Sequence, residues 1–152
     1  MSVLGSLDDG RLVPVGPDYP DARGGADGVL VLRIEGSLYF GNSDYATQYI
    51  LAQTLLHANI RAIVLDGMYL HDMDATTIQA LEALQTQLKE RKLAFVLANA
   101  QAHLATIVKL SGLDLGFSMP EISLSIHDTI ARLREINIHE RQTPPVIVVC
   151  RQ

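Results

Sequence analysis

The chain has 152 residues, of which 48% are hydrophobic and 19% are charged, and its formal net charge is −5. This size and composition indicate one globular domain with enough apolar material for a core. The acidic balance and the scattered placement of the 12 Lys and Arg residues argue against nucleic-acid binding, which depends on clustered cations. The single cysteine, Cys150, excludes an internal disulfide and fits a reducing compartment.

No membrane span or signal peptide is visible in the sequence. No run reaches the roughly 18 apolar residues that a span requires, and the amino terminus lacks a basic start followed by an apolar stretch. We therefore expect the chain itself to be soluble. A domain taken from a membrane protein would show the same pattern, so this expectation concerns these residues alone.

The first part of the chain is rich in glycine and proline. We expect residues 1–28 to form a flexible N-terminal arm, in which residues 11–15 add a possible edge strand. Residues 29–40, VLVLRIEGSLYF, are rich in strand-forming side chains, and the glycine at position 36 predicts a strand, a kink and a second strand.

Helices and strands alternate after residue 40. A first helix is predicted over residues 41–56, with cap candidates Asn42, Ser43 and Asp44. Its predicted apolar face holds Tyr45, Tyr49, Leu51, Leu55 and Leu56. The later predicted elements are a buried strand over 61–66, an amphipathic helix from Asp74, a buried strand over 93–98, a helix that stops at Gly112, and a last helix capped by Ser125 and Asp128.

This alternation implies crossover connections and a sheet that is at least partly parallel. We predict an α/β fold in which a central mixed β-sheet is covered by about four helices. Residues 139–152 are expected to form a C-terminal tail, because Pro144 and Pro145 break the last helix. Residues 146–149 are apolar and suited to pairing on a sheet edge, within this chain or with a neighbour.

The junction at residues 65–84, LDGMYLHDMDATTIQALEAL, places Asp66, His71, Asp72 and Asp74 close together in sequence. Imidazole and carboxylate groups are ligands for zinc or manganese, but the other histidines are dispersed and show no ligand spacing. Acid-base catalysis is disfavoured because no nucleophile elbow, oxyanion donor or glycine-rich phosphate loop accompanies the acids. We predict no catalytic residue, no metal and no cofactor.

The start of a helix is a simpler explanation for these acids. Asp74 stands where an N-cap belongs, and its carboxylate can accept hydrogen bonds from the amides of Thr76 or Thr77. Anion binding at this helix end is disfavoured, because no Arg or Lys lies between Asp66 and Gln87 to offset the carboxylates.

Three segments carry a resemblance to a known family. A strand ending in VLD, a short loop and the helix MDATTIQALEALQTQLKERK resemble the STAS domain, which anti-sigma factor antagonists share with the cytoplasmic domains of SulP-type anion transporters. The segment LANAQAHLATIVKLSGL is similar to the transporter branch. The transporter-type run I-x-G-x-L-x-F-x-N is matched by Ile34, Gly36, Leu38, Phe40 and Asn42. The resemblance covers about residues 29–136, and we predict a STAS domain over residues 29–138.

The resemblance also implies what residue 75 does. In the antagonists, a serine at the matching position is phosphorylated by a partner kinase, and dephosphorylation restores binding to that kinase. This chain has Ala75, which carries no hydroxyl, so that switch cannot operate at this residue. Thr76 offers a neighbouring hydroxyl, whose expected role is hydrogen bonding at the helix start. The resemblance therefore favours the transporter branch.

The function implied is that of a non-enzymatic regulatory and interaction domain of a SulP-family transporter of sulfate, bicarbonate or a similar anion. Such domains lie at the cytoplasmic face of the inner or plasma membrane and support assembly and regulation. The implied partners are the transmembrane domain of the parent transporter, a second copy in a homodimer, and a cytoplasmic regulatory protein. The alternative is a free-standing signalling protein similar to the anti-sigma factor antagonists.

We name residues 68–77 the candidate contact surface. The residues expected to touch a partner there are Met68, Tyr69, His71, Asp72, Asp74, Thr76 and Thr77. Met68 and Tyr69 are apolar residues in a predicted loop. They are either anchors for a partner or core residues under the end of the sheet, and the sequence leaves both readings open.

Overall fold

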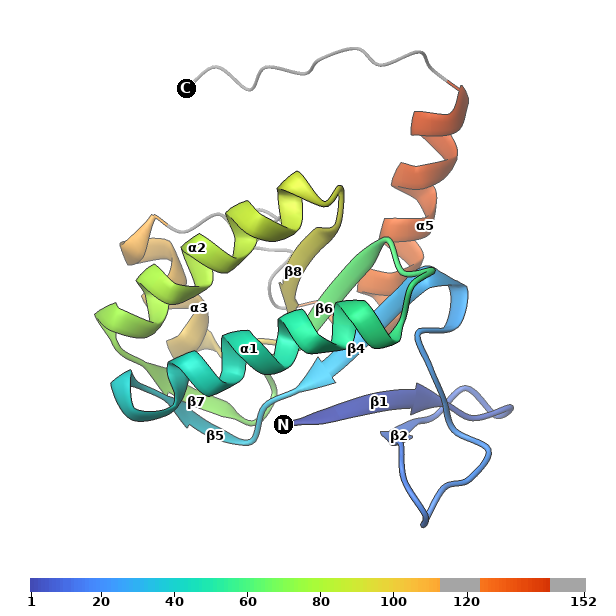
Figure 1. The fold of residues 1–152 in the computed structure, drawn as a ribbon, viewed down its shortest axis with the longest axis horizontal. Coiled ribbons are helices and arrows are strands. Elements are labelled where there is room, and N and C mark those ends of the chain that lie inside the picture. Colours follow the sequence, from blue (N-terminus) through green and yellow to red (C-terminus); the bar gives the residue numbers. More distant parts are fainter. Residues whose placement is uncertain (113–123, 143–152) are drawn as a thin grey trace.

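A mixed sheet forms the centre of the computed structural model, which describes residues 1–112 and 124–142 (Figure 1). Its strands are β1 (Ser2–Ser6), β2 (Leu12–Pro14), β3 (Arg23–Gly24), β4 (Val29–Arg33), β6 (Ala62–Asp66) and β8 (Ala94–Ala98). They lie in the order β2-β1-β4-β6-β8, with β3 also paired to β1. A separate two-stranded sheet is formed by β5 (Gly36–Leu38) and β7 (Leu70–Met73).

The strands β4, β6 and β8 are parallel, and β8 forms the edge of the sheet opposite β2. Their sequences VLVLR, AIVLD and AFVLA are almost continuously apolar, as expected of strands covered on both faces. Arg33 pairs in register with Asp66, which in turn pairs with Ala98, so the carboxyl ends of the three strands lie level. The antiparallel β1 makes the sheet mixed, which confirms the predicted fold class.

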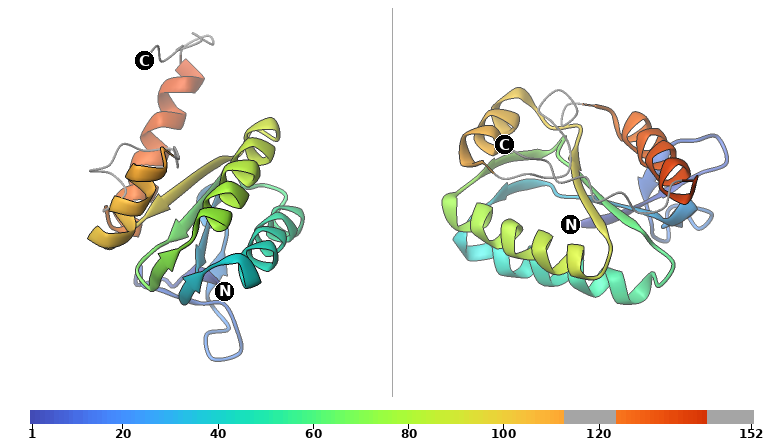
Figure 2. Two further views of the ribbon diagram at one scale, coloured as in Figure 1. Left: turned by 90° about the vertical axis from the view of Figure 1, so that its left-hand side faces the viewer. Right: turned by 90° about the horizontal axis from the view of Figure 1, so that it is seen from above.

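Four α-helices surround the sheet within the described residues: α1 (Phe40–Leu56), α2 (Ala75–Glu90), α3 (Ala102–Ser111) and α5 (Ile126–Gln142). Helices α1 and α2 lie side by side on one face, and α5 lies on the opposite face (Figure 2). A short 3-10 turn, Ala26–Gly28, leads into β4. No helix in the described ranges combines the length and the apolar content that crossing a membrane requires.

The two faces of the sheet have side chains of different size. Successive residues of a strand point to opposite faces, so the V-L-V-L pattern of β4 sends leucines one way and valines the other. The larger side chains pack under α1, α2 and α3, including Leu30, Leu32, Ile63, Leu65 and Leu97. The smaller ones lie under α5 and include Val29, Val31, Val64 and Val96. The sequence of one strand therefore serves two cores.

The expectation of a flexible arm is wrong for residues 2–6, which form β1 and pair antiparallel with β4. Leu4 is only 2% exposed and belongs to the core under α5. Gly5 permits the close approach of the following segment, because a Cβ there would meet Val15 Cγ2 at 2.8 Å. The possible edge strand in residues 11–15 is confirmed as β2, which forms one edge of the sheet.

The buried face of α1 also differs from the prediction. Tyr45, Leu55 and Leu56 are 66%, 77% and 74% exposed, whereas the buried stripe consists of Ser43, Ala46, Ile50 and Gln53. Two of these four are polar, so the stripe facing the sheet carries no clear apolar signal. The helix keeps the required three- and four-residue spacing, and of the predicted face Tyr49 and Leu51 are partly buried against the core.

The end of α3 and the start of α5 agree with the predictions from the sequence. Gly112 ends α3 in the left-handed conformation, with φ of 72°. The amide of Asp128 donates to Ser125 Oγ at 3.1 Å, and that hydroxyl donates to Asp128 Oδ2 at 2.7 Å, as the predicted cap requires. Helix α5 runs to Gln142 and so enters the region predicted to be a tail from residue 139. Residues 143–152, including the apolar segment 146–149 and Cys150, lie outside the described residues.

Replacing Leu4 by alanine tests the role of β1. We expect Leu4→Ala to lower the free energy of unfolding by about 2–4 kcal/mol, because it leaves a cavity in the core under α5. The measurement is urea denaturation followed by circular dichroism. Val15→Ala is the control, since Val15 is 46% exposed and its replacement should change stability little. Equal effects of the two changes would contradict an integral β1.

Candidate functional site

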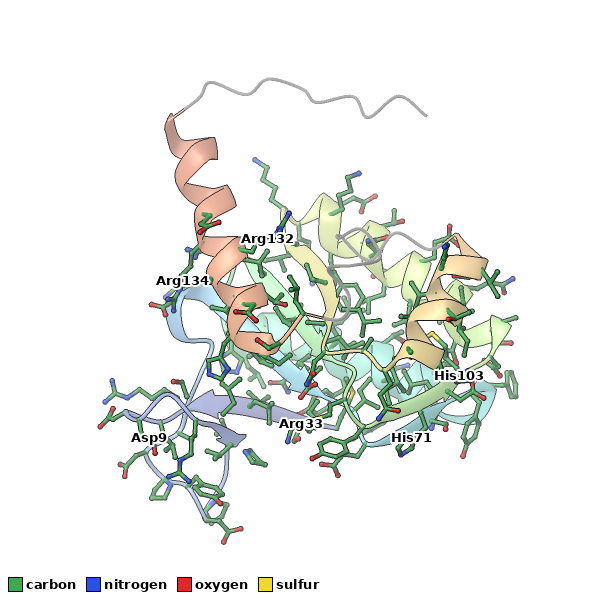
Figure 3. All side chains as sticks on the ribbon, turned by 180° about the vertical axis from the view of Figure 1, so that it is seen from behind. Asp9, Arg33, His71, His103, Arg132 and Arg134 are labelled. Carbon is green, nitrogen blue, oxygen red and sulfur yellow. The ribbon has the colours of Figure 1, made fainter. Side chains whose placement is uncertain are left out.

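The structure separates the four chemical groups of the junction into three environments. Asp66 ends β6 and is 0% exposed. His71 and Asp72 lie on β7 with exposed side chains, and His71 points outward from this end of the molecule (Figure 3). Asp74 follows β7 and caps α2. The groups are close in sequence, but they do not share one reaction centre.

Asp66 joins the carboxyl ends of the parallel strands. Its Oδ2 accepts from Arg33 Nε at 2.9 Å, and its Oδ1 accepts from Asn99 Nδ2 and from the Met68 amide, each at 3.1 Å. Arg33 ends β4 and Asn99 follows β8, so one buried carboxylate connects three neighbouring strand ends. These partners compensate the carboxylate for its loss of water. Its role in the fold is structural.

Residues 70–73, expected to be a loop, form the strand β7 instead. β7 pairs parallel with β5, with Leu70 beside Gly36 and Met73 beside Leu38. The amide of Gly36 also donates to the carbonyl of Tyr69 at 2.9 Å. This pairing is short and non-local, so it left only a weak pattern in the sequence. It places residues 70–73 of the candidate contact surface in a small sheet.

Asp74 is the predicted N-cap of α2, and it also holds the start of α1. Its Oδ1 accepts from the Thr77 amide at 2.8 Å, and its Oδ2 accepts from the Phe40 amide at 2.9 Å. Phe40 is the first residue of α1. The amide of Asp74 donates to the carbonyl of Leu38 at 3.2 Å, which completes the link between β5 and the start of α2.

The start of α1 differs from the predicted cap. Tyr39 is the N-cap residue, and its amide donates to Asn42 Oδ1 at 2.9 Å. Asn42, one of the three cap candidates, therefore acts from inside the first turn and not as the N-cap itself. The free amide of Phe40 is satisfied by Asp74, which is 34 residues away in sequence. That distance explains why the sequence pattern did not show this partner.

The hydrogen bonds to Asp74 lower its pKa from the ordinary value. The Thr77 amide makes the largest contribution, followed by the Phe40 amide, because both donors favour the charged carboxylate. The folded state therefore gains stability from this group above the pKa of the unfolded chain, and loses it as the pH falls through the lowered pKa. Asp74 is ionised at neutral pH and acts as a cap.

Met68 and Tyr69 are 43% and 42% exposed, so they are neither core residues nor fully exposed anchors. Each residue is held by a neighbouring side chain and remains partly exposed to solvent. The carbonyl of Met68 accepts from Gln101 Nε2 at 2.9 Å, and the guanidinium of Arg33 lies 5.1 Å from the Tyr69 ring centroid. A cation over an aromatic ring is attracted to its face, so this contact favours the observed ring position.

The threonines of the first turn of α2 differ in access. Thr77 is 1% exposed and cannot touch a partner, so its place in the predicted contact set is wrong. Ala75 and Thr76 are exposed. Residue 75 is therefore positioned as an accessible modification site would be, but it has no hydroxyl to modify.

Two exposed residues next to the candidate contact surface were not identified from the sequence. Tyr39 and Phe40 are 55% and 77% exposed at the corner between β5 and α1, and the Asp74 bridge holds that corner beside the start of α2. The sequence analysis placed Phe40 in a strand. The available signal was an aromatic pair just before a helix, in a position with no predicted core beneath it.

The exposed acids of the junction have few close charged partners. Asp72 Oδ1 lies 3.9 Å from His103 Nε2, and both side chains are largely exposed to water. Across residues 1–112 and 124–142, no three His, Cys, Asp or Glu side chains converge in a way that could hold a metal ion. The expectation of a chain without metal, cofactor or catalytic residue stays a prediction. What the site presents is a rigid helix start ringed by exposed aromatic and apolar side chains.

Fold and site together define a mixed α/β domain whose accessible feature is a capped helix start. A STAS domain family profile matches residues 21–130, and the chain belongs to this family. Among curated proteins it is similar to sulfate transporter 1.2 of Arabidopsis thaliana, with 28% identity over 130 residues, covering 74% of this chain and 19% of the relative. The chain thus spans about a fifth of the length of that relative.

Solved structures show the same fold. The murine Slc26a9 anion transporter in its inward-facing state matches 88% of this chain and 22% of its own, with a TM-score of 0.74 and 23% identity. The unphosphorylated anti-sigma factor antagonist SpoIIAA matches 70% of this chain and 89% of its own, with a TM-score of 0.57 and 19% identity. The predicted resemblance to the STAS domains of SulP-type transporters is confirmed.

The Asp66 link predicts a large loss of stability on truncation. Asp66→Ala should lower the free energy of unfolding by about 2–4 kcal/mol, because it removes three hydrogen bonds and leaves Arg33 without its buried counter-charge. Chemical denaturation measures this loss. Asp72→Ala is the matched control, since Asp72 is exposed and should be replaceable without measurable change. A neutral Asp66→Ala variant would contradict the link.

The lowered pKa of Asp74 predicts a pH-dependent difference between the native chain and Asp74→Asn. Asparagine retains an acceptor for the cap but carries no charge. The native chain should be more stable than this variant at pH 7, and the difference should start to shrink near pH 4 and be lost as the pH falls through the lowered pKa of Asp74. Thermal unfolding of both proteins across acidic pH measures this difference. A difference that is constant with pH would show that the charge contributes nothing.

Proposed function

We propose that this chain acts as the non-enzymatic regulatory and interaction domain of a SulP-family inorganic-anion transporter, at the cytoplasmic face of the membrane. In this role it supports assembly and regulation through protein contacts. The observation that carries the proposal is the match to sulfate transporters, in which the similar region occupies only about a fifth of the protein. The remainder of such a protein is the transport part, and its membrane domain is the proposed main partner.

The candidate contact surface and the adjoining Phe40 support this role because their aromatic side chains are accessible and stand on a backbone or beside a neighbour that is held in place. Phe40 is 77% exposed, yet its amide is held by Asp74. Tyr69 is 42% exposed, yet its ring lies against Arg33. Exposed aromatic side chains in fixed positions lose little conformational entropy on binding and commonly anchor interfaces. We propose that Tyr39 and Phe40 join Met68 and Tyr69 as the anchors.

His71, Asp72 and Thr76 form the polar part of the same proposed surface. All three are exposed, and the two acids Asp72 and Asp74 make this region anionic at neutral pH. Polar rims of this kind contribute to specificity and to the association rate more than to affinity. We therefore propose that a partner presents cationic groups opposite these acids. A homodimer and a separate regulatory protein remain proposals of the same kind.

The second candidate function is a free-standing signalling protein of the antagonist type. The fold likeness to SpoIIAA, which extends over 89% of that chain, favours it. Ala75 disfavours it, because the accessible position at the start of α2 lacks the hydroxyl that the antagonist switch uses. Such a protein would need a kinase partner acting at another residue, for which Thr76 is the nearest exposed hydroxyl.

A capture experiment separates the two functions. The purified chain is immobilised and exposed to detergent-solubilised membranes and to the soluble fraction of its source cells, and bound proteins are identified by mass spectrometry. We expect capture of a multi-span SulP-type protein from the membranes. Capture of a soluble serine or threonine kinase instead would favour the signalling function and contradict the proposal.

A variant locates the contact on the surface. Phe40→Ser should reduce capture of the transporter by about tenfold, as expected when an aromatic anchor is lost. The matched control is Leu56→Ser, at the other end of α1, where the side chain is 74% exposed against 77% for Phe40. If both variants bind equally well, the candidate contact surface is not the interface.

A further inference from the structure

A cavity of about 240 Å³ lies on the α5 side of the sheet, away from the candidate contact surface. It opens to solvent and is bordered by the strands β1, β2 and β3, by the 3-10 turn, by the start of β4 and by the first turns of α5. The side chains and backbone that line it come mainly from the N-terminal region that the sequence analysis expected to be a flexible arm. This region therefore has a built interior as well as an edge strand.

The floor of the cavity is apolar. Leu4, Val29 and Val31 are 2–3% exposed and belong to the core under α5, against which Leu12 and Ile130 also pack. Helices α1, α2 and α3 pack on the core of larger side chains, and α5 is the described helix that packs on this one. A single helix does not span the whole face, so the part of the sheet nearest β1 and β2 is left with the cavity above it.

The rim of the cavity is polar and carries more positive than negative charge. Arg23, Asp27, His127 and Arg134 line it together with the apolar floor. Arg134 of α5, labelled in Figure 3, forms an ion pair with Asp27. His127 Nε2 donates to the carbonyl of Gly10 at 2.8 Å. These two contacts fasten α5 over the cavity.

Arg23 differs from the other charged groups of the rim. It is exposed, and within the described part of the chain it makes no ion pair, whereas Arg134 is neutralised by Asp27. The rim therefore retains one unpaired guanidinium beside apolar walls, in a chain whose net charge is −5. A guanidinium matches a carboxylate through two parallel hydrogen bonds.

We propose that this cavity is a binding site for a small amphipathic carboxylate, with its apolar part against Leu4, Val31 and Ile130 and its carboxylate on Arg23. The volume is below the range of roughly 300–1,000 Å³ typical of sites for drug-sized ligands, so the ligand is small. A single negative charge fits better than a multiply charged group, because Asp27 stands on the same rim. This inference is independent of the transporter role proposed above.

An NMR titration of the ¹⁵N-labelled chain tests the site with sodium hexanoate as the probe. Sodium acetate, which lacks the apolar part, and hexan-1-ol, which lacks the charge, are the comparison ligands. We expect saturable shifts with hexanoate at amides of β1, β3, β4 and the first turns of α5, and clearly weaker binding of the other two. Absence of saturation, or shifts confined to other parts of the fold, would overturn the proposal.

Arg23→Met removes the guanidinium and keeps an unbranched apolar side chain at an exposed position. It should weaken hexanoate binding by about tenfold or more, the effect expected for losing a charged hydrogen-bond partner. The matched control is Arg11→Met, because Arg11 is exposed in the same N-terminal region but pairs with Asp9 and does not line the cavity. Equal affinities of the two variants would contradict the assignment of Arg23.

Discussion

The carboxylate of Asp74 is the interaction on which the accessible end of this domain depends. One oxygen accepts from the amide of Thr77 in the first turn of α2, and the other accepts from the amide of Phe40 at the start of α1. Helix starts leave unpaired amides that require partners, and here a single side chain supplies a partner to each of two helices. The relative position of the two helix starts, and of the aromatic residues beside them, follows from this shared acceptor.

The buried carboxylate of Asp66 also joins separate elements, in this case the ends of the strands. It links Arg33 at the end of β4 with Asn99 after β8, and it also holds the amide of Met68 where the chain leaves β6. Asp66 therefore aligns the strand ends, whereas Asp74 aligns the helix starts. In open α/β sheets the carboxyl ends of the strands are the usual place for binding sites, and this domain presents its exposed aromatic residues at that end. Asp66 and Asp74 are explained by the hydrogen bonds that they make within the fold.

Local patterns in the sequence predicted the parts of the fold that local patterns determine. The parallel strands were visible as apolar runs, α2 as an amphipathic helix, and the caps at Asp74 and Ser125 from their position before a helix. The buried stripe of α1 was not visible, because Ser43 and Gln53 are half of it. Strand β1 was not visible either, since its few apolar residues precede glycine- and proline-rich turns.

The site was predictable as a region but not as a set of contacts. Asp74 was identified as a cap. Its hydrogen bond to Phe40 spans 34 residues, and no local spacing pattern in the sequence indicates such a contact. The burial of Thr77 and the exposure of Phe40 depend on how α1 packs against α2, which is decided by tertiary contacts. The same reason explains the cavity under α5, whose lining comes from six elements and whose unpaired Arg23 is defined only by its neighbours in space.

Hydrogen exchange of individual amides in the native state tests the shared acceptor most directly. In Asp74→Ala, the amides of Phe40 and Thr77 should both lose protection, while amides in the middle of α1 and α2 keep theirs. Loss of protection at Thr77 alone, with Phe40 unchanged, would show that the carboxylate caps one helix only and would contradict this account.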